Sequence, residues 1–252
     1  MDQAKLFDVA DKVVCVTGAS SGLGRSAATM FAQSGAKVVG VARREPELKA
    51  WQSETTAEVS IVVADLSNRA ALKDTAVAVC EPYGPPDILI NAAGINARQH
   101  ADEVTAEQWD KTMNLNLAAP FFLAQELVDG MKKKGWGRIV NFASLQSRRA
   151  FPNGISYGAS KGGVEQMTRA MAESWSKYGI LSNAIAPGFM PTELTAKVFE
   201  DSEMATGFAN QTCIGRNGVA EDLHGPLLFL CSSASDYVTG QILFVDGGFT
   251  AK

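Results

Sequence analysis

Short apolar runs rich in β-branched residues recur along this chain, and most are followed by a turn signal and a longer stretch with helical periodicity. Strands that alternate with helices of about ten or more residues predict parallel strands joined by right-handed crossovers. The expected strands cover residues 12–17, 36–42, 59–67, 87–94 and 179–188, the run RIVNFAS, and the last run QILFVDGG. We therefore expect an α/β fold with a doubly wound parallel sheet flanked by helices.

The composition restricts the class of protein. The chain has 252 residues, 46% of them hydrophobic and 20% charged, with a net charge of -4. These values are ordinary for a soluble globular protein, and the negative charge argues against a nucleic-acid partner. No linker, repeat or low-complexity tract divides the chain, so residues 1–252 are expected to form a single domain.

Several signals that would indicate another compartment or a metal are missing. The N-terminus lacks a basic region followed by an apolar run, and no stretch reaches about 18 apolar residues, so neither a signal peptide nor a membrane partner is expected. The four cysteines are scattered without a CxxC pair and only two histidines are present, so no metal site or disulfide is expected. We expect a cytoplasmic protein with reduced thiols.

The turn TGASSGLG follows the first expected strand and precedes a helix. Gly18, Gly22 and Gly24 allow backbone torsions closed to other residues and let a diphosphate approach the amide groups at the helix N-terminus. The second strand ends without an acid that would bind a ribose hydroxyl, and offers Arg43 and Arg44 instead. We expect Arg43 to bind a 2′-phosphate and Arg44 to be solvated at a helix start. This favours NADP(H) as the cofactor, with NAD(H) as the alternative.

A serine, a tyrosine and a lysine have a spacing suited to acid–base chemistry. Ser144 precedes Tyr157 by thirteen residues, and Tyr157 precedes Lys161 by four. Four residues on a helix place Tyr157 and Lys161 on one face, where the ammonium would lower the pKa of the phenol from its ordinary value of about 10. Ser144 ends the run RIVNFAS, so its hydroxyl is expected at the carboxyl end of a strand, where open α/β sheets bind ligands. The three groups are expected to converge on one carbonyl oxygen.

Two longer segments flank this site in the sequence. A helix is expected from 107 to 134, continuous except at Pro120, with Asn114 and Asn116 close to the kink that a proline produces. Residues 189–216 have an irregular pattern and carry apolar side chains. These would form either a short helical lid over the site or part of the permanent core.

With these residues placed, the chain resembles the short-chain dehydrogenase/reductase family from about residue 12 to the C-terminus. The matching motifs are TGASSGLG, Asp65, NAAG at 91–94, Asn116, Ser144, Tyr157 with Lys161, the PG pair at 187–188, Thr192, and VDGG at 245–248. The resemblance implies a Rossmann-like sheet of seven strands, a nicotinamide cofactor and a homotetramer. It also implies a catalytic tetrad of Asn116, Ser144, Tyr157 and Lys161.

The family mechanism implies a role for each member of the tetrad. Ser144 would hydrogen-bond the substrate oxygen, and Tyr157 would give that oxygen a proton during reduction and remove one during oxidation. Lys161 would also hold the nicotinamide ribose, and Asn116 would position a water in the proton relay. The resemblance implies cofactor contacts from Gly18, Ser20, Ser21, Gly22, Leu23, Gly24, Arg43, Asp65, Leu66, Asn91, Ala92, Gly94, Tyr157, Lys161, Pro187, Gly188, Met190 and Thr192.

One departure from the family concerns the cofactor. Many NADP-dependent members carry a basic residue where this chain has Ser21. The expected preference for NADP(H) therefore rests on Arg43 and on the missing acid.

The expected function is that of an NADPH-preferring carbonyl reductase or alcohol dehydrogenase, which interconverts a small ketone and a secondary alcohol. The segments NAAGINARQH and NAIAPGFMPTEL look most like sugar-acid dehydrogenases of this family, such as gluconate 5-dehydrogenase, which are the first alternative. A non-catalytic dinucleotide-binding sensor would be expected to lose the tyrosine or the lysine. An enoyl reductase would have a wider Tyr–Lys interval than the four residues here.

Substrate contacts are expected from Ser144, Tyr157, Gln146 and one arginine. Arg98 follows the fourth expected strand on the cleft side, where it could pair with a substrate carboxylate. Arg148 and Arg149 lie between the serine and the tyrosine, and solvated surface charge is the more frequent state for such residues.

Overall fold

The computed structural model describes residues 5–252, so the first four residues of the expected 1–252 domain lie outside it. Within that range the strands form one seven-stranded sheet in the order β3-β2-β1-β4-β5-β6-β7, and every pair is parallel. They are β1 (Val13–Thr17), β2 (Lys37–Ala42), β3 (Val59–Val63), β4 (Ile88–Asn91), β5 (Gly137–Phe142), β6 (Ile180–Pro187) and β7 (Ile242–Val245). The predicted α/β class and parallel sheet are confirmed.

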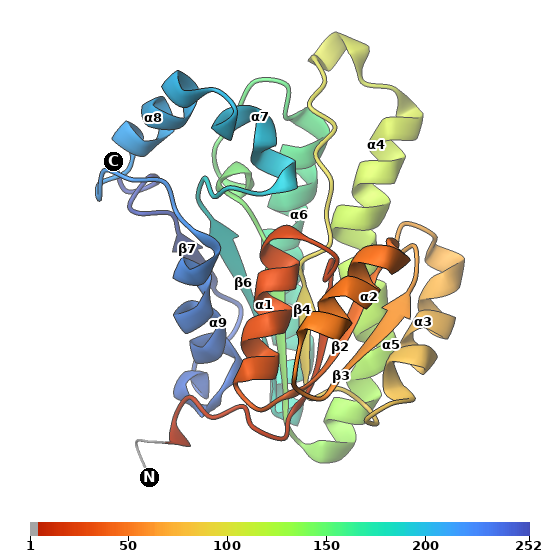
Figure 1. Ribbon diagram of the computed structural model, residues 1–252. Coiled ribbons are helices and arrows are strands. Elements are labelled where there is room, and N and C mark those ends of the chain that lie inside the picture. Colours follow the sequence, from red (N-terminus) through yellow and green to blue (C-terminus); the bar gives the residue numbers. More distant parts are fainter. Residues whose placement is uncertain (1–4) are drawn as a thin grey trace.

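Helices cover both faces of the sheet (Figure 1). On one face lie α1 (Gly22–Gln33), α2 (Glu45–Glu54) and α9 (His224–Cys231), and on the other lie α3 (Leu72–Cys80), α4 (Ala106–Met113), α5 (Ala119–Lys134) and α6 (Ile155–Trp175). Each face buries its own apolar core, centred on Phe31 and Trp51 on the first and on Leu123 and Met131 on the second. Because both faces are covered, every residue of β1, β4 and β5 is buried, rather than every second residue.

The strand order creates a topological switch point beside β1. The chain passes from β1 to β2 and β3 on one side and then returns to place β4 on the other side of β1. Loops that leave β1 and β4 therefore diverge, and open α/β sheets bind ligands in the crevice that results. The helices α7 (Ala196–Phe199) and α8 (Ser202–Gln211) lie above these carboxyl ends (Figure 1).

The predicted strands extended too far at their carboxyl ends. β3 ends at Val63 rather than at residue 67, and β4 ends at Asn91 rather than at residue 94. Beyond its strand, each segment turns away to line the crevice, so Asp65 and Gly94 belong to loops. Ser144 likewise lies two residues past the end of β5.

The helix predicted over 107–134 is interrupted before Pro120. α4 ends at Met113, Asn114–Ala118 form a π-helical turn, and α5 starts at Ala119 with Pro120 in its first turn. Because proline has no N–H, Pro120 cannot donate to the carbonyl four residues earlier, which belongs to Asn116. The predicted disturbance is present, but it is a π-helical turn, a feature often found at functional sites.

The segment 189–216, whose sequence pattern is irregular, is largely helical. It contains a 3₁₀ turn at Glu193–Thr195, then α7 and α8. Of its apolar residues, Met190 and Val198 are buried in the molecule, whereas Leu194 and Met204 are exposed. Part of the segment therefore belongs to the core, and part remains at the surface above the cleft.

Candidate active site

A cleft of about 530 Å³ opens at the carboxyl ends of the strands. It is lined by the loops that follow the first six strands, β1 to β6, and by the start of α6. The predicted positions that line it are Gly18, Ser20, Ser21, Gly22, Leu23, Gly24, Arg43, Leu66, Ala92, Gly94, Arg98, Ser144, Gln146, Tyr157, Lys161, Pro187, Gly188, Met190 and Thr192. One cavity thus brings together the glycine turn and the serine–tyrosine–lysine set.

The glycine turn has the geometry of an anion cradle. Gly18 adopts a φ of +74°, and a Cβ there would lie 2.9 Å from the backbone nitrogen of Ala93. A Cβ at Gly24 would lie only 2.3 Å from the carbonyl oxygen of Gly18. The N-cap residue of α1, Ser21, makes no capping hydrogen bond, and no acidic residue occupies the first turn. The N–H groups and the positive end of the helix therefore suit the diphosphate of a dinucleotide.

Ser144, Tyr157 and Lys161 meet at the other end of the cleft. The Oγ of Ser144 accepts a hydrogen bond from the backbone N–H of Gln146 at 3.1 Å, which leaves the hydroxyl proton for another acceptor. Tyr157 and Lys161 lie one turn apart on α6, and the Nζ of Lys161 lies 5.6 Å from the centroid of the tyrosine ring. That Nζ donates to the carbonyl oxygen of Phe142 at 2.6 Å. The predicted shared face is confirmed.

The pKa prediction for Tyr157 was wrong in direction. Burial raises the pKa of the phenol because it penalises the phenolate, and this outweighs the stabilisation that the Ser144 hydroxyl and the Arg98 guanidinium provide. Burial also lowers the pKa of Lys161 from 10.5 to about 8. Loss of water therefore decides both protonation states, and it favours the neutral form of each group.

Three predicted positions, Asn91, Asp65 and Asn116, do not line the cleft. The Nδ2 of Asn91 donates to the Oδ1 of Asn141 at 2.9 Å inside the sheet. Asp65 accepts hydrogen bonds from the backbone and side chain of Ser67, and although burial raises its pKa, these bonds and the charge of Arg43 lower it overall.

Asn116 acts on the cleft wall through its side chain. Its Oδ1 accepts from the backbone N–H of Ile95, and its Nδ2 donates to the carbonyl of Ile95, both at 2.9 Å. The Nδ2 also donates to the Oγ of Ser160 at 3.1 Å. Asn116 therefore fixes the loop after β4 against α6.

Among the three candidate arginines, only Arg98 lines the cleft. It adopts a left-handed φ of 46°, and its N–H donates to the Oδ1 of Asn96. An isolated parallel bridge between Gln99 and Gly154 holds this loop beside the start of α6. The guanidinium is close enough to stabilise the phenolate of Tyr157, which lowers the pKa of that phenol.

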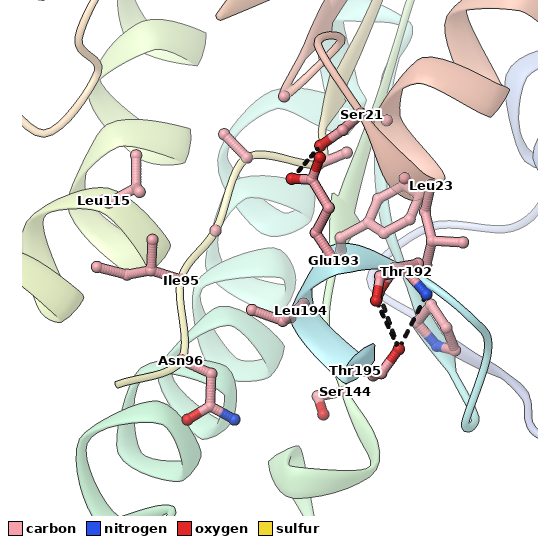
Figure 2. Close-up of a pocket in the computed structure, with 18 of the residues that line it drawn as sticks. Ser21, Leu23, Ile95, Asn96, Leu115, Ser144, Thr192, Glu193, Leu194 and Thr195 are labelled. Atoms are coloured by element: carbon pink, nitrogen blue, oxygen red, sulfur yellow. Dashed lines mark hydrogen bonds between the residues drawn. The ribbon is translucent and has the colours of Figure 1, made fainter. Parts of the chain in front are cut away.

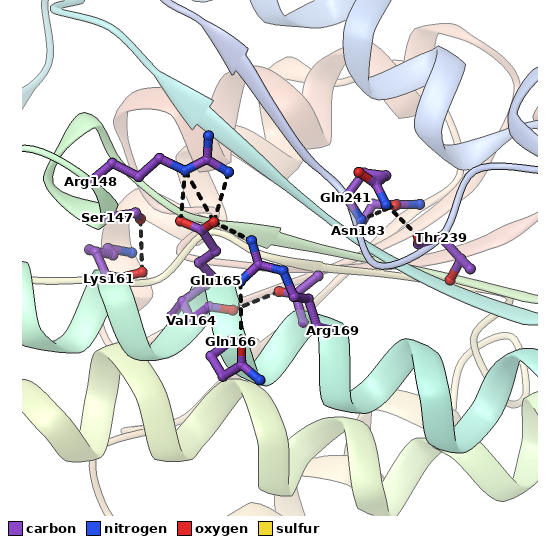
Figure 3. A network of polar contacts seen from close by, with 11 residues as sticks. Ser147, Arg148, Lys161, Val164, Glu165, Gln166, Arg169, Asn183, Thr239 and Gln241 are labelled. Atoms are coloured by element: carbon purple, nitrogen blue, oxygen red, sulfur yellow. Dashed lines mark hydrogen bonds and ion pairs between the residues drawn. The ribbon is translucent and has the colours of Figure 1, made fainter. Parts of the chain in front are cut away.

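Arg148 and Arg149 have partners elsewhere. Arg148 forms an ion pair with Glu165 at 2.8 Å, and Arg169 binds the same carboxylate (Figure 3). Arg149 donates to the carbonyl oxygen of Phe249 and lies over its ring. Neither residue faces the substrate side of the cleft.

The family follows from comparison with known proteins. A family model described as "Enoyl-(Acyl carrier protein) reductase" matches residues 18–250. The chain belongs to the short-chain dehydrogenase/reductase family. It is therefore an oxidoreductase that acts on CH–OH and C=O groups with NAD or NADP.

Relatives and solved structures match this dehydrogenase over nearly its full length. Gluconate 5-dehydrogenase of Gluconobacter oxydans (strain 621H) is 39% identical over 255 residues, which cover 100% of both chains. The 2-dehydro-3-deoxy-D-gluconate 5-dehydrogenase of Dickeya dadantii (strain 3937) is 40% identical and covers 98% of both. The crystal structure of a gluconate 5-dehydrogenase from Burkholderia cenocepacia J2315, in complex with NADP and tartrate, has a TM-score of 0.93 at 33% identity and covers 98% of both.

Several residues lining this dehydrogenase's cleft escaped the sequence reasoning. Arg44, predicted to be solvated, instead bonds Ser20, Ser21 and Glu193 across the cleft mouth. Figure 2 shows Ser21 and Glu193 joined in this way. The only sequence signal for Glu193 was its charge next to Thr192 in the PTEL segment. Its pairing with Arg44 could not be predicted, because the two residues are 149 positions apart in the sequence.

An aromatic wall also escaped the sequence reasoning. Phe151 and Phe189 line the cleft, and their ring centroids lie 5.8 Å apart. Phe208 of α8 stacks on Phe189 with a centroid distance of 3.7 Å, and Phe249 packs against both Phe151 and Phe189. The four aromatic residues come from separate parts of the chain, so no local sequence pattern predicts that they pack together.

Residues 5–252 contain neither a candidate membrane span nor a candidate metal cluster. No helix in that range is long and apolar enough to cross a membrane. No group of three or more His, Cys, Asp and Glu side chains there is arranged to hold a metal ion.

Proposed function

We propose that this enzyme interconverts a secondary hydroxyl and a keto group of a sugar acid, with NADP(H) as its preferred cofactor. The observation that carries the proposal is the convergence of Ser144, Tyr157 and Lys161 with the cationic Arg98 on one cleft. The names of the two curated relatives support a sugar-acid substrate, as does the tartrate in the Burkholderia enzyme. These comparisons favour the sugar acid over the small ketone that we first expected.

The chemistry divides among the residues of the cleft. A bound nicotinamide supplies or accepts the hydride. The free hydroxyl proton of Ser144 stabilises the charge that develops on the substrate oxygen, and the phenol of Tyr157 gives that oxygen its proton during reduction. In oxidation the same phenol takes the proton back. Lys161, whose Nζ lies beside the ring of Tyr157, holds the nicotinamide ribose and balances the charge of the phenolate.

Asn116 takes part through its main chain in this proposal. Its side chain is occupied by Ile95 and Ser160, so the water of the proton relay is assigned to its carbonyl in the π-helical turn. We assign Asp65 to the adenine half of the cofactor and Asn91 to the nicotinamide half. Both would act through their backbones and the loops that follow them, because their side chains already bind other residues of the protein.

The cofactor preference rests on the loop after β2. Arg43 is exposed at the cleft, and the position before it is alanine rather than an acid that would bind a ribose 2′-hydroxyl. A guanidinium provides a planar fork of donors for a phosphate. We therefore assign the 2′-phosphate to this loop.

A carbonyl reductase for ketones with an apolar group is the second candidate. The aromatic wall of Phe151 and Phe189 favours it, because aromatic side chains bind apolar ligand surface. Enoyl reduction is disfavoured, since Tyr157 and Lys161 lie one helical turn apart.

The remaining proposals follow the family. We propose a homotetramer in which α4, α5 and α6 form one interface and β7 another. Half-buried aromatic residues on these helices support the first interface, with Phe121 and Trp175 stacked at 6.4 Å. The segment 189–216 is proposed as a lid.

The deciding experiment measures absorbance at 340 nm with keto-sugar acids and with apolar cyclic ketones, each with NADPH and NADH. The wild type should reduce the keto acids with the higher kcat/KM. Arg98→Ala should lower kcat/KM at least tenfold on a keto acid and leave a neutral ketone of similar size nearly unchanged. Equal effects on both substrates would remove Arg98 as a carboxylate clamp, and with it the main physical support for the sugar acid.

A further inference from the structure

An anion site at the cleft mouth is occupied by a carboxylate of the protein itself. The Nη2 of Arg44 donates to the Oγ of Ser21 at 2.6 Å and to the Oγ of Ser20 at 3.2 Å. The same guanidinium binds both oxygens of Glu193, with Nη2–Oε2 at 3.0 Å and Nη1–Oε1 at 3.2 Å. The Oγ of Ser21 donates to that carboxylate as well, at 3.0 Å (Figure 2). Glu193 therefore sits among donors that suit any small oxyanion.

The site lies where the adenosine ribose of a dinucleotide belongs. Arg44 follows the carboxyl end of β2 by two residues, and the two serines belong to the glycine turn before α1. In this fold the ribose binds at the end of the second strand, next to that turn. A 2′-phosphate and the carboxylate of Glu193 would thus compete for the same guanidinium and hydroxyls.

Glu193 also links this site to the segment 189–216. It starts the 3₁₀ turn at Glu193–Thr195, in which the Oγ1 of Thr195 donates to the carbonyl of Met190 at 2.6 Å. The side chain of Thr192 lies beside the glycine turn, since a Cβ at Gly22 would lie 3.4 Å from it. The contact between Arg44 and Glu193 therefore ties the segment to the phosphate cradle.

The ion pair between Arg44 and Glu193 is weak enough for a phosphate to displace the carboxylate. The side chain of Arg44 is 40% exposed and that of Glu193 is 64% exposed. Exposed ion pairs contribute little free energy, whereas a phosphate brings more charge and a third acceptor oxygen.

We propose that Glu193 is a specificity-determining residue that holds the cation of Arg44 until a 2′-phosphate displaces it, and that this displacement frees the turn at Glu193–Thr195. The inference rests on the proposed preference for NADP(H). It assigns Arg44, beside Arg43, to recognition of the phosphate. The segment 189–216 therefore responds to NADP(H), which carries the 2′-phosphate, and not to NAD(H).

The test uses calorimetry with two fragments, adenosine 2′,5′-bisphosphate and adenosine 5′-monophosphate. Glu193→Gln and Glu193→Ala should each bind the bisphosphate about threefold to tenfold more tightly than the wild type, because an internal competitor is removed. Their affinity for the monophosphate should change less than twofold. Glu47→Gln is the matched control, since Glu47 approaches Arg44 at 3.7 Å from α2 without touching the segment.

A second readout follows the segment without any turnover. Trypsin cuts after Lys197, which is exposed in α7. The bisphosphate should accelerate this cut in the wild type and in Glu47→Gln, whereas both Glu193 variants should be cut quickly from the start. The monophosphate should have no effect.

The outcomes separate this inference from the cofactor proposal. A wild type that binds both fragments equally would refute the preference for NADP(H) and the role of Glu193 together. A wild type that prefers the bisphosphate, with Glu193 variants that match it in affinity and cleavage, would overturn the role of Glu193 alone. Equal gains in Glu47→Gln and Glu193→Gln, with no change in cleavage, would also overturn it, since general electrostatics would then explain the affinity.

Discussion

Lys161 is a buried amine whose removal should stabilise the fold while it destroys activity. Only 5% of the residue is exposed, and burial lowers its pKa from 10.5 to about 8. Lys161→Met keeps an unbranched side chain of similar length and removes the charge. We expect this variant to lose turnover and to unfold at a higher denaturant concentration than the wild type at pH 7.

The magnitude follows from proton linkage. A pKa of about 8 in place of 10.5 corresponds to roughly 3 kcal/mol of destabilisation by the buried charge, at about 1.36 kcal/mol for each pH unit. Methionine loses the hydrogen bond from Nζ to the carbonyl of Phe142, which costs about 1 kcal/mol. The net gain at pH 7 is therefore roughly 2 kcal/mol, or about 4 to 8 °C in Tm for a chain of this size.

The pH determines how much of the destabilisation by the buried charge of Lys161 is present. Below pH 8 both the folded and the unfolded chain carry the proton on Lys161, so the full penalty for the buried charge is present. Between about pH 8 and 10.5 only the unfolded chain keeps the proton, and the wild type gains stability as the pH rises. The advantage of Lys161→Met should therefore be largest at pH 7 and should shrink steadily towards pH 10.

Urea unfolding of both proteins at pH 7, 8, 9 and 10, followed by tryptophan fluorescence, measures this difference. Lys73→Met is the matched control, because Lys73 is exposed on α3 and the same substitution there should show no such pH dependence. The reasoning fails if Lys161→Met is less stable than the wild type at pH 7, or if its advantage is the same at pH 10.

Three further predictions concern activity, cofactor and assembly. Tyr157→Phe should lower kcat by about 10²- to 10⁴-fold, with cofactor affinity in calorimetry largely intact, because only the acidic proton is lost; a variant that keeps a tenth of kcat would contradict this role. Arg43→Ala should raise KM for NADPH at least tenfold and hardly affect NADH, as the loss of a charge-assisted contact of about 1.5 to 3 kcal/mol implies; a wild type that prefers NADH would contradict the assignment. Light scattering should give the mass of four chains, and the 26.8 kDa of one chain would exclude the tetramer.

Most of the fold could be predicted because strands and turns are encoded locally. The apolar runs around Val14 and Ile90 are continuous, which is typical of strands buried on both faces, and a glycine turn marks the start of α1. The ends of the strands could not be placed, because a strand ends where its neighbours stop pairing with it. The π-helical turn at Asn114–Ala118 was missed for a similar reason, since only the carbonyl and amide partners of the folded helix distinguish it from an α-helix.

Most of the predicted positions in the candidate site lie at the cleft, because motif residues at the ends of parallel strands meet at one edge of the sheet. The errors concern side chains whose partners are far away in the sequence. Arg44 was predicted to be solvated, which is reasonable for a charged residue at a helix start, yet Glu193 and the two serines of the glycine turn surround it. Arg148 was expected to be a solvated surface charge, yet it forms an ion pair with Glu165 on the neighbouring helix.

The direction of the pKa of Tyr157 has a mechanistic consequence. The spacing of four residues correctly placed Lys161 on the same helix face as Tyr157. The protonation of both side chains, however, depends on how much hydrating water each loses on burial. The surrounding strands and loops impose that loss. Burial raises the pKa of the phenol and lowers that of the amine, so near pH 8 the tyrosine holds its proton while the lysine begins to lose its own. The neutral phenol is the form that the proposed role of Tyr157, proton donation during reduction of a keto group, requires. Oxidation needs the phenolate, and the cation of Arg98, which already lowers the pKa of this phenol, lies on the side of the cleft where it can favour that form.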